Sequence, residues 1–399
     1  MMAAHSAVCA GARVTLVERN EKMGRKIYIT GKGRCNLTNN CSGAEVLQNV
    51  PRNSKFLFSA MEQFSPAKTM EFFRAHGLAI KTERGNRVFP VSDKAADVID
   101  TLFFALKRQR VSFVHGRVEG ITAGENGVTG VVLEGGKTLS CDRVIVATGG
   151  CSYPLTGSSG DGYRMAQELG HSVVEPTASL IPLVEEGEDC AKMQGLALKN
   201  VEIRVRNKKN KVVFQEFGEL LFTHFGLSGP LILSASAHLK DIGKEPYTVS
   251  IDLKPALDEK KLDERILRDF AENQNKEYAN ALGGLLPRLM IPVMVERTEI
   301  PPETRVHDIT KAQRRKLLET IKRFDVVVCG TRPVSEAIVT RGGIKVGEIN
   351  PSTMESKKCP GLYFAGEVID VDAYTGGFNL QIAWATGHVA GINAARQEE

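Results

Sequence analysis

Length and composition indicate a globular protein of two or three domains, with 399 residues of which 42% are hydrophobic and 25% charged. The formal net charge of +5 is small for this size, so we expect no nucleic-acid partner. No apolar run approaches the roughly 20 residues of a membrane span, and the N-terminus lacks the charged and apolar regions of a signal peptide. We therefore expect a cytoplasmic protein with no membrane partner.

The cysteines and histidines form none of the spacings that bind metals or carry out dithiol chemistry. The eight cysteines include no C-x-x-C pair, and the eight histidines include no H-E-x-x-H. Zinc binding and dithiol redox chemistry are therefore not expected, and free thiols in a reducing cytoplasm are the default. We predict no metal site.

The N-terminal segment has the pattern of the back half of a dinucleotide-binding βαβ unit. Residues 1–12 predict a helix that ends at Gly11, and the apolar strand Val14–Val17 leads directly into Glu18. In such units the acid holds the ribose hydroxyls of adenosine. The first strand and its glycine loop are missing, and the usual spacing of about 20 residues predicts that they lie upstream of residue 1. The alternative is a surface helix and an unrelated strand that ends in Glu.

A basic loop rich in glycine follows, with Gly31 and Gly33 on either side of Lys32. Backbone N–H groups in such a loop, with Lys and Arg beside them, can bind a diphosphate. A solvated loop is the alternative. Two glycines so close together are not needed in a solvated loop, which favours the binding role.

The middle of the chain contains two kinds of β pattern. Runs with glycine turns between residues 111 and 140 predict a meander. The strand that begins at Arg143 ends in Thr148, Gly149 and Gly150, as expected where backbone approaches a ligand at the carboxyl edge of a parallel sheet. From about residue 180, alternating runs indicate an antiparallel sheet or barrel. We predict a first domain from residues 1–178 and 346–399, and an inserted domain from residues 179–345.

The C-terminal part of the chain combines a short apolar strand, Leu362–Ala365, with an acid, two glycines and a helix that opens near Phe378. Glu367 at the strand end can accept hydrogen bonds from sugar-like hydroxyls. Gly376 and Gly377 have no Cβ, so a flat ligand can lie against their backbone. The helix N-terminus suits an electron-rich ring edge. This combination favours a bound flavin, with an ordinary strand, glycine turn and helix as the alternative.

Six segments in the same order resemble the BaiN-like family of FAD-dependent oxidoreductases, which includes proteins described as aminoacetone oxidases and a bile-acid reductase. They are GRKIYITGKGRCNLTNN, RVIVATGG, TGSSGDGYRMAQELGH, THFGLSGP, VTRGGIKVGEINPSTMESK and GLYFAGEVIDVDAYTGGFNLQIAWATGHVAG. The resemblance implies an α/β fold. A two-part Rossmann-like FAD-binding domain of the glutathione-reductase type would carry an inserted antiparallel β-barrel with a helical segment at residues 257–324.

The resemblance also implies roles for single residues in binding FAD. Glu18, with Arg19 beside it, would contact the adenosine ribose, Val118 the adenine, and Glu367 the ribityl chain. The other implied contacts are Lys26, Arg34, Cys35 and Asn36 beside the diphosphate and ring, Thr148 and Gly149 at a strand end, and Gly377, Phe378, Asn379 and Leu380 at the helix opening. Tyr374, beside the glycines, is our candidate proton donor, with a packing role as the alternative.

Three functions from different classes remain open. The first is NAD(P)H-dependent reduction of a conjugated C=C bond in a 3-oxo steroid or bile-acid substrate, such as a CoA ester. The second is oxidation of an amine or aminoketone by oxygen, and the third is a flavoprotein that acts mainly as a binding or RNA-modification partner. The sequence contains no second G-x-G-x-x-G, which favours transient docking of NAD(P)H. No basic face supports the third function, so we expect a small-molecule substrate.

Overall fold

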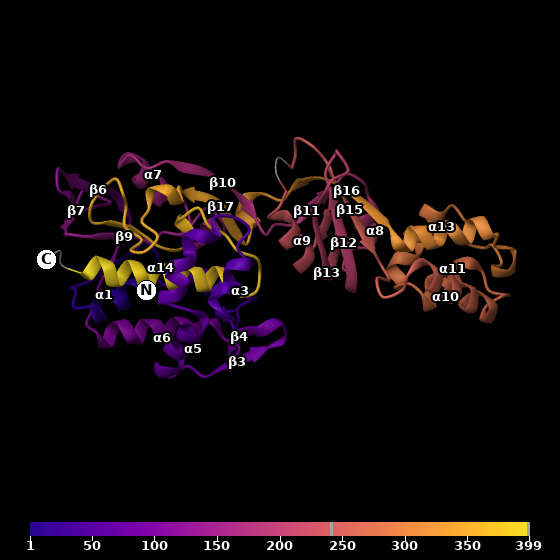
Figure 1. Ribbon diagram of the computed structural model, residues 1–399, viewed down its shortest axis with the longest axis horizontal. Coiled ribbons are helices and arrows are strands. Elements are labelled where there is room, and N and C mark those ends of the chain that lie inside the picture. Colours follow the sequence, from indigo (N-terminus) through magenta and orange to yellow (C-terminus); the bar gives the residue numbers. More distant parts are fainter. Residues whose placement is uncertain (240–241, 397–399) are drawn as a thin grey trace. The chain divides into compact units, whose positions relative to one another are not determined.

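The computed structural model describes residues 1–239 and 242–396 and divides into two compact units (Figure 1). The first unit comprises Met1–Ser179 and Pro333–Glu399, and the second comprises Leu180–Arg332. The sequence predicts that the inserted part extends to residue 345. The structure ends it at Arg332, because strand β17 (Val339–Ile344) pairs with β10 (Val173–Ser179) of the first unit.

Two pairs of parallel strands form the centre of the first unit. Strand β1 (Thr15–Glu18) pairs with β5 (Ser112–His115), and β9 (Val144–Val146) pairs with β18 (Leu362–Phe364). In a doubly wound sheet one further strand would lie between two such pairs. Within the described part of the chain no strand joins them. Their facing edges border a cavity instead.

Helix α14 (Phe378–Ala395) packs closely against α1 (Met2–Cys9). Gly391 permits this approach, because a Cβ at that position would lie 2.3 Å from the backbone oxygen of Ala3. Trp384 of α14 is buried, and its Nε1 donates a hydrogen bond to the carbonyl of Leu37 at 2.8 Å. Because α14 is apolar on nearly every side, it belongs in the core rather than on the surface.

The other elements of the first unit surround this core. Helices α4 (Phe58–Gln63) and α5 (Pro66–Ala75) are separated before Pro66, where the side chain of Ser65 caps the second helix. The predicted meander is present from residue 118 onward as β6 (Val118–Gly124), β7 (Gly127–Leu133) and β8 (Thr138–Ser140), whereas its predicted first run forms β5 and pairs in parallel with β1. The remaining elements are β2 (Thr38–Asn39), β3 (Ile80–Glu83), β4 (Arg87–Pro90), α2 (Arg25–Ile29), α3 (Gly43–Gln48), α6 (Ala95–Arg108) and α7 (Asp161–Glu168).

The second unit contains a closed antiparallel barrel, as predicted. Its strands, in order around the barrel, are β11 (Leu183–Glu185), β14 (Gly226–Ser228), β13 (Val212–Thr223), β12 (Ala197–Arg206), β15 (Tyr247–Asp252) and β16 (Phe324–Thr331). Alternate residues of β12 fill the interior, since Val201, Ile203 and Val205 are buried. Closure leaves no free strand edge. The basic run at residues 204–211 spans the turn between β12 and β13.

Short helices complete the second unit. They are α8 (Asp189–Lys192), α9 (Pro230–Ser236), α10 (Glu259–Glu272), α11 (Tyr278–Ala281), α12 (Ile291–Thr298) and α13 (Lys311–Lys322). The last begins with a capping box, in which the Thr310 hydroxyl accepts from the Gln313 N–H and the Gln313 side chain accepts from the Thr310 N–H. Across the described ranges, no helix combines the length and the apolar character needed to span a membrane.

We expect the free energy of unfolding to depend on the protonation of His5, which lies in α1 against the ring of Phe72 at 5.0 Å. Burial, and then the nearby His76 and His388, lower the pKa of His5 from 6.5 to about 4. Between about pH 6.5 and pH 4, His5 is therefore protonated in the unfolded chain but neutral in the folded protein. Stability should fall as the pH decreases from about 6.5 to about 4, by on the order of 1–2 kcal/mol for this half-buried group.

Urea unfolding of the His5→Phe variant across this pH range tests the expectation. The variant should lose part of the pH dependence, whereas the control His115→Gln, at an exposed position, should retain it. An identical pH dependence in wild type and His5→Phe would contradict the assignment.

Candidate functional site

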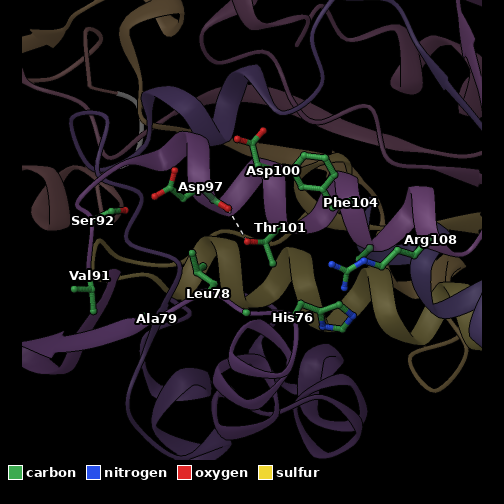
Figure 2. A pocket seen from close by; sticks show the side chains of 12 residues that line it. His76, Leu78, Ala79, Val91, Ser92, Asp97, Asp100, Thr101, Phe104 and Arg108 are labelled. Carbon is green, nitrogen blue, oxygen red and sulfur yellow. Dashed lines mark hydrogen bonds between the residues drawn. The ribbon is translucent and has the colours of Figure 1, made fainter.

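A cavity of about 1870 Å³ lies in the first unit, bordered by the facing strands β1 and β9. The meander and residues of α1 and α14 complete its walls. Its volume exceeds the roughly 300–1,000 Å³ of most small-molecule sites, so it offers space for a ligand of dinucleotide size. Figure 2 shows a second pocket of about 520 Å³, lined by residues of α6 such as Thr101 and Phe104 and by His76, which contains none of the predicted site residues.

The first turn of α14 borders the cavity. Asn379 and Leu380 line the cavity, and no side chain caps the helix. The helix therefore has N–H groups without intrahelical partners, together with a partial positive charge. Gly377 precedes it with φ +97°, and a Cβ at this position would lie 2.4 Å from the carbonyl oxygen of Thr38. Only glycine fits there, and the geometry suits an electron-rich ligand edge.

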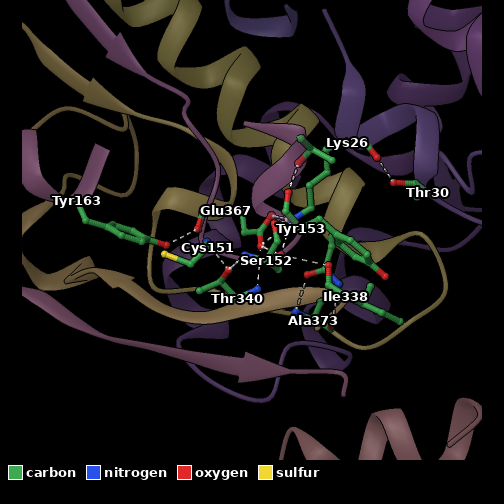
Figure 3. A network of polar contacts seen from close by, with 12 residues as sticks. Lys26, Thr30, Cys151, Ser152, Tyr153, Tyr163, Ile338, Thr340, Glu367 and Ala373 are labelled. Carbon is green, nitrogen blue, oxygen red and sulfur yellow. Dashed lines mark hydrogen bonds and ion pairs between the residues drawn. The ribbon is translucent and has the colours of Figure 1, made fainter. Parts of the chain in front are cut away.

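Glu367 lies at the centre of a network of polar contacts that Figure 3 shows. Lys26 Nζ lies 2.8 Å from its Oε2, and the Ser152 hydroxyl donates to its Oε1 at 2.9 Å. The backbone N–H of Thr340 also donates to Oε1, at 2.8 Å. The carboxylate is thereby fixed in place beside the cavity, which it lines. Sequence reasoning identified Glu367 and Lys26 but missed Ser152 and Thr340, which lie far away in the chain.

Glu18 lies at the end of β1 and also lines the cavity. Its Oε1 accepts hydrogen bonds from the backbone N–H of Asn20 at 2.9 Å and from the Asn20 amide at 2.8 Å. Its other oxygen has no hydrogen-bond partner in the part of the chain that the structure describes. An acid held by one oxygen and free at the other can accept hydrogen bonds from the hydroxyls of a ribose.

Next to Glu18, two arginines form ion pairs with one aspartate. Arg19 donates to Asp161 at 3.1 Å and to the Ser159 hydroxyl at 2.7 Å. Arg117 holds the same carboxylate with two hydrogen bonds, at 2.7 and 3.1 Å. These contacts lower the pKa of Asp161, with the Arg117 bond as the main cause. Arg19, predicted as a cofactor contact, lines the cavity but is already ion-paired.

The glycine-rich loop divides into residues at the cavity and residues away from it. Arg34, Cys35 and Asn36 do not line the cavity, unlike Lys26. Arg34 donates through Nε to Asp93 at 2.9 Å, pairs with Glu83, and lies over the ring of Phe89. Its charge is therefore satisfied inside the protein. Sequence spacing could not reveal this, because both acids lie about fifty residues or more further along the chain.

Cys35 and Asn36 have unusual surroundings. Cys35 is fully buried with φ +59°, and burial raises the pKa of its thiol to about 12, so it is not a thiolate at neutral pH. The Oδ1 atom of Asn36 is buried and has no hydrogen-bond partner in the described part of the protein. It would lie 2.9 Å from a Cβ at Gly377, which places this unpaired acceptor beside the start of α14.

The structure brings most of the predicted contacts together. The predicted residues that line the cavity are Glu18, Arg19, Lys26, Val118, Thr148, Gly149, Glu367, Asn379 and Leu380. Gly377 and Phe378 stand at the helix start without lining the cavity. Tyr374, the predicted proton donor, is half-buried and does not line it either, while its backbone N–H donates to the Asn49 carbonyl at 3.0 Å.

These residues fit FAD. The cavity is lined by two acids, Glu18 and Glu367, by residues of the meander and by the first turn of α14, whose N-terminus no side chain caps. Gly149, which lines the cavity with φ +76°, permits close approach of a ligand, and the buried, unpaired Oδ1 of Asn36 lies near the helix start. This donor and acceptor set matches hydroxyls and an electron-rich ring system. No group of His, Cys, Asp and Glu in the described residues could hold a metal ion.

The fold and the site define a Rossmann-type FAD-binding domain combined with an antiparallel barrel. Residues 1–393 match the family described as HI0933-like protein Rossmann domain. The chain belongs to this family of FAD-dependent oxidoreductases.

Curated relatives of similar length carry two different names. The chain is 33% identical over 394 residues to the 3-dehydro-bile acid delta(4,6)-reductase of Clostridium scindens, covering 97% of this chain and 93% of that protein. It is 34% identical over 378 residues to the ribosomal RNA dihydrouridine synthase of Escherichia coli, covering 94% of this chain and 90% of that protein. Among solved structures, the E. coli quinol fumarate reductase subunit FrdA has a TM-score of 0.50 at 14% identity, covering 99% of this chain and 68% of that one. That likeness concerns the fold alone.

We expect Glu18→Ala to weaken FAD binding by on the order of 1.5–3 kcal/mol, because the change removes charge-assisted hydrogen bonds to hydroxyls. Flavin fluorescence titration of the purified protein measures the affinity. The control is Glu21→Ala, an exposed acid three residues away. Equal affinities in wild type and Glu18→Ala would show that the adenosine end lies elsewhere.

Proposed function

We propose that the protein is an FAD-dependent reductase of a C=C bond conjugated to a carbonyl group, with NAD(P)H as a transient co-substrate. The observation that carries this proposal is the reaction that the two relatives' names share. A delta(4,6)-reductase and a dihydrouridine synthase both saturate a C=C bond, although their substrates differ. Family membership supports the flavin, and sequence identity of about one third to both relatives over nearly the whole chain supports a common reaction type.

The residues of this chain would bind and orient the cofactor, while FAD when bound supplies hydride chemistry. The start of α14, at Asn379 and Leu380, would stabilise negative charge on the ring. Glu18 and Glu367 would accept hydrogen bonds from the cofactor's hydroxyls. Cys35, with its raised thiol pKa, takes no part in a dithiol relay. Tyr374 is retained as the proposed proton donor.

The first candidate substrate is a 3-oxo steroid or bile-acid derivative, such as a CoA ester. The bile-acid reductase, related over 97% of this chain, supports it. Such a substrate is bulky and apolar, and it would need a protein surface of the same character near the flavin. The exposed Ile338, which also borders the cavity, is consistent with this requirement.

The second candidate substrate is a uracil base in ribosomal RNA, and a specific observation favours it. Lys22, Arg25 and Lys32 have no acidic partner in the described residues, although they lie within one short segment. The side chain of Tyr28 in the same segment is 60% exposed, and Ile29 beside it is exposed as well. Cations without acidic partners, in the same short segment as an exposed aromatic ring, suit phosphates and a stacked base. The small net charge of the whole chain does not reveal this local cluster of cations.

One set of anaerobic measurements separates the candidates. The FAD-loaded protein is titrated with NADH or NADPH, and bleaching of the flavin absorbance reports reduction. The reduced protein is then mixed with a 3-oxo-4,6-diene steroid or with unmodified ribosomal RNA, and mass spectrometry detects the gain of two hydrogens. Reoxidation by only one substrate identifies it. In a separate aerobic assay, steady oxidation of aminoacetone by oxygen, with neither C=C substrate reduced, would instead establish the oxidase alternative.

A further inference from the structure

The loop at residues 370–377 joins β18 and the short turn Gly366–Val368 to the start of α14, and its geometry determines where that helix begins. Several backbone contacts fix it. The Asn53 amide donates to the carbonyl of Asp370 at 2.7 Å, and the Asn39 amide donates to the carbonyl of Gly376 at 3.0 Å. Asn379 closes the loop on itself, accepting from the Ala373 N–H at 2.9 Å and donating to the Ala373 carbonyl at 2.7 Å.

Two buried carboxylates in this loop share one guanidinium. The side chain of Asp372 is 1% exposed and that of Asp370 is 8% exposed, whereas that of Arg52 is 26% exposed. Arg52 Nη2 lies 2.6 Å from Asp372, and its Nη1 lies 3.3 Å from Asp370. Isolated buried charges are costly, so the guanidinium is what permits two acids at this depth.

The remaining hydrogen bonds to the carboxylates come from neutral donors. The Ser179 hydroxyl donates to Asp372 at 2.7 Å, and the Asn53 amide donates to Asp370 at 3.1 Å. Hydrogen bonds from neutral groups orient the carboxylates without cancelling their charge. The Arg52, Asp370 and Asp372 cluster therefore carries a net charge of −1, and this value depends on a single arginine.

This charged cluster adjoins the cofactor cavity. Val371, which lies between the two acids in the chain, lines the cavity, as do Asn379 and Leu380 at the start of α14. The part of the cavity that receives the helix N-terminus thus also receives the field of the two carboxylates. These acids oppose negative charge on a ligand there, whereas the helix N-terminus favours it.

We propose that Arg52 is a positioning residue that sets the reduction potential of the flavin, by halving the negative charge of the loop and holding it against the start of α14. The inference rests on the proposed binding of FAD with its ring near α14. Two electrons and one proton convert the oxidised flavin to its anionic reduced form, so reduction adds negative charge to the cavity. Each additional uncompensated carboxylate should make that step less favourable.

Four variants test the electrostatic role in the FAD-loaded protein, with the potential measured by dye-coupled anaerobic titration. Arg52→Met changes the cluster to −2 and Asp372→Asn changes it to 0, while the double variant Arg52→Met/Asp372→Asn returns it to −1. Arg52→Lys retains the charge. Asparagine suits position 372 because its oxygen can still accept from Arg52, and the Ser179 hydroxyl can turn to accept from its amide.

The potential should follow the charge of the cluster. The reduction potential of Asp372→Asn should be higher than that of wild type, and the potential of Arg52→Met should be lower. The double variant and Arg52→Lys should have potentials close to that of wild type. Each unit of charge should change the ratio of reduced-form to oxidised-form affinity by on the order of tenfold. The surface control Arg315→Met in α13 should leave the potential unchanged.

A purely structural role gives a different result. Loss of FAD or stability in the variants, with equal potentials in all that bind flavin, would overturn the inference. Arg52→Met alone could fail to fold, because a broken buried pair can cost about 3–5 kcal/mol. In that case the difference in reduction potential between Asp372→Asn and the double variant still tests the electrostatic role. If wild-type protein binds no FAD, the proposed function fails instead, so the two failures are distinguishable.

Discussion

Replacing Gly377 with alanine is expected to abolish high-affinity FAD binding and to destabilise the first unit. The residue has φ +97°, which L-residues rarely adopt, and its new Cβ would lie 2.4 Å from the carbonyl oxygen and 2.5 Å from the carbonyl carbon of Thr38. Backbone atoms cannot move away as a flexible side chain can. Backbone strain and steric conflict together should cost on the order of 2–4 kcal/mol in the free energy of unfolding. Urea unfolding and flavin titration measure the two effects.

Gly170→Ala is the matched control for this variant. Gly170 also has positive φ, at +83°, but no heavy atom lies within 4 Å of the position of its Cβ. The control should therefore show only the conformational cost, on the order of 1–2 kcal/mol, and should bind FAD normally. If both variants lose the same stability and neither loses FAD, the close contact between Gly377 and Thr38 is not part of the binding site.

The fold was most predictable where local pattern and tertiary role coincide. The glycines, the acid and the apolar helix near the C-terminus predict a helix that opens near Phe378, and α14 begins there. The strand that ends at Glu18 and the meander were predictable, because alternation and glycine turns are local signals. The barrel followed from alternating runs beyond residue 180. Its end at Arg332 was missed, because the pairing of β17 with β10 joins residues 160 or more positions apart.

The candidate site was predictable only in part, because binding residues are defined by partners distant in the chain. Arg34 looks like a phosphate ligand in its loop, yet it pairs with Glu83 and Asp93. Ser152 and Thr340, which hold Glu367, stand in segments that carry no signal of that role. The cluster of Arg52 with Asp370 and Asp372 spans more than 300 residues. Charge counts over the whole sequence likewise hide local clusters of unpaired cations.

Glu367→Gln and Lys26→Met should each weaken FAD binding substantially. Glu367 would lose the charge that strengthens its hydrogen bonds to cofactor hydroxyls, on the order of 1.5–3 kcal/mol or roughly 10- to 150-fold in Kd. Lys26→Met would leave the partly buried Glu367 with the Ser152 hydroxyl and the Thr340 N–H as its only donors among the described residues. The exposed Lys22→Met serves as the control for loss of a positive charge nearby. Wild-type affinity in both variants would remove Glu367 from the binding site.

The double variant Lys26→Met/Glu367→Gln determines what Lys26 does. Its Nζ lies 2.8 Å from Glu367 and also bonds the Ser152 side chain, so within the protein it already has partners. If Lys26 acts by holding Glu367, the double variant should bind FAD about as well as Glu367→Gln alone, with a coupling energy of about 0.5–3 kcal/mol. If Lys26 contacts the diphosphate directly, the two losses should add. We expect coupling. To contact a ligand, Lys26 would have to give up its ion pair with Glu367 in a partly buried network, which costs free energy.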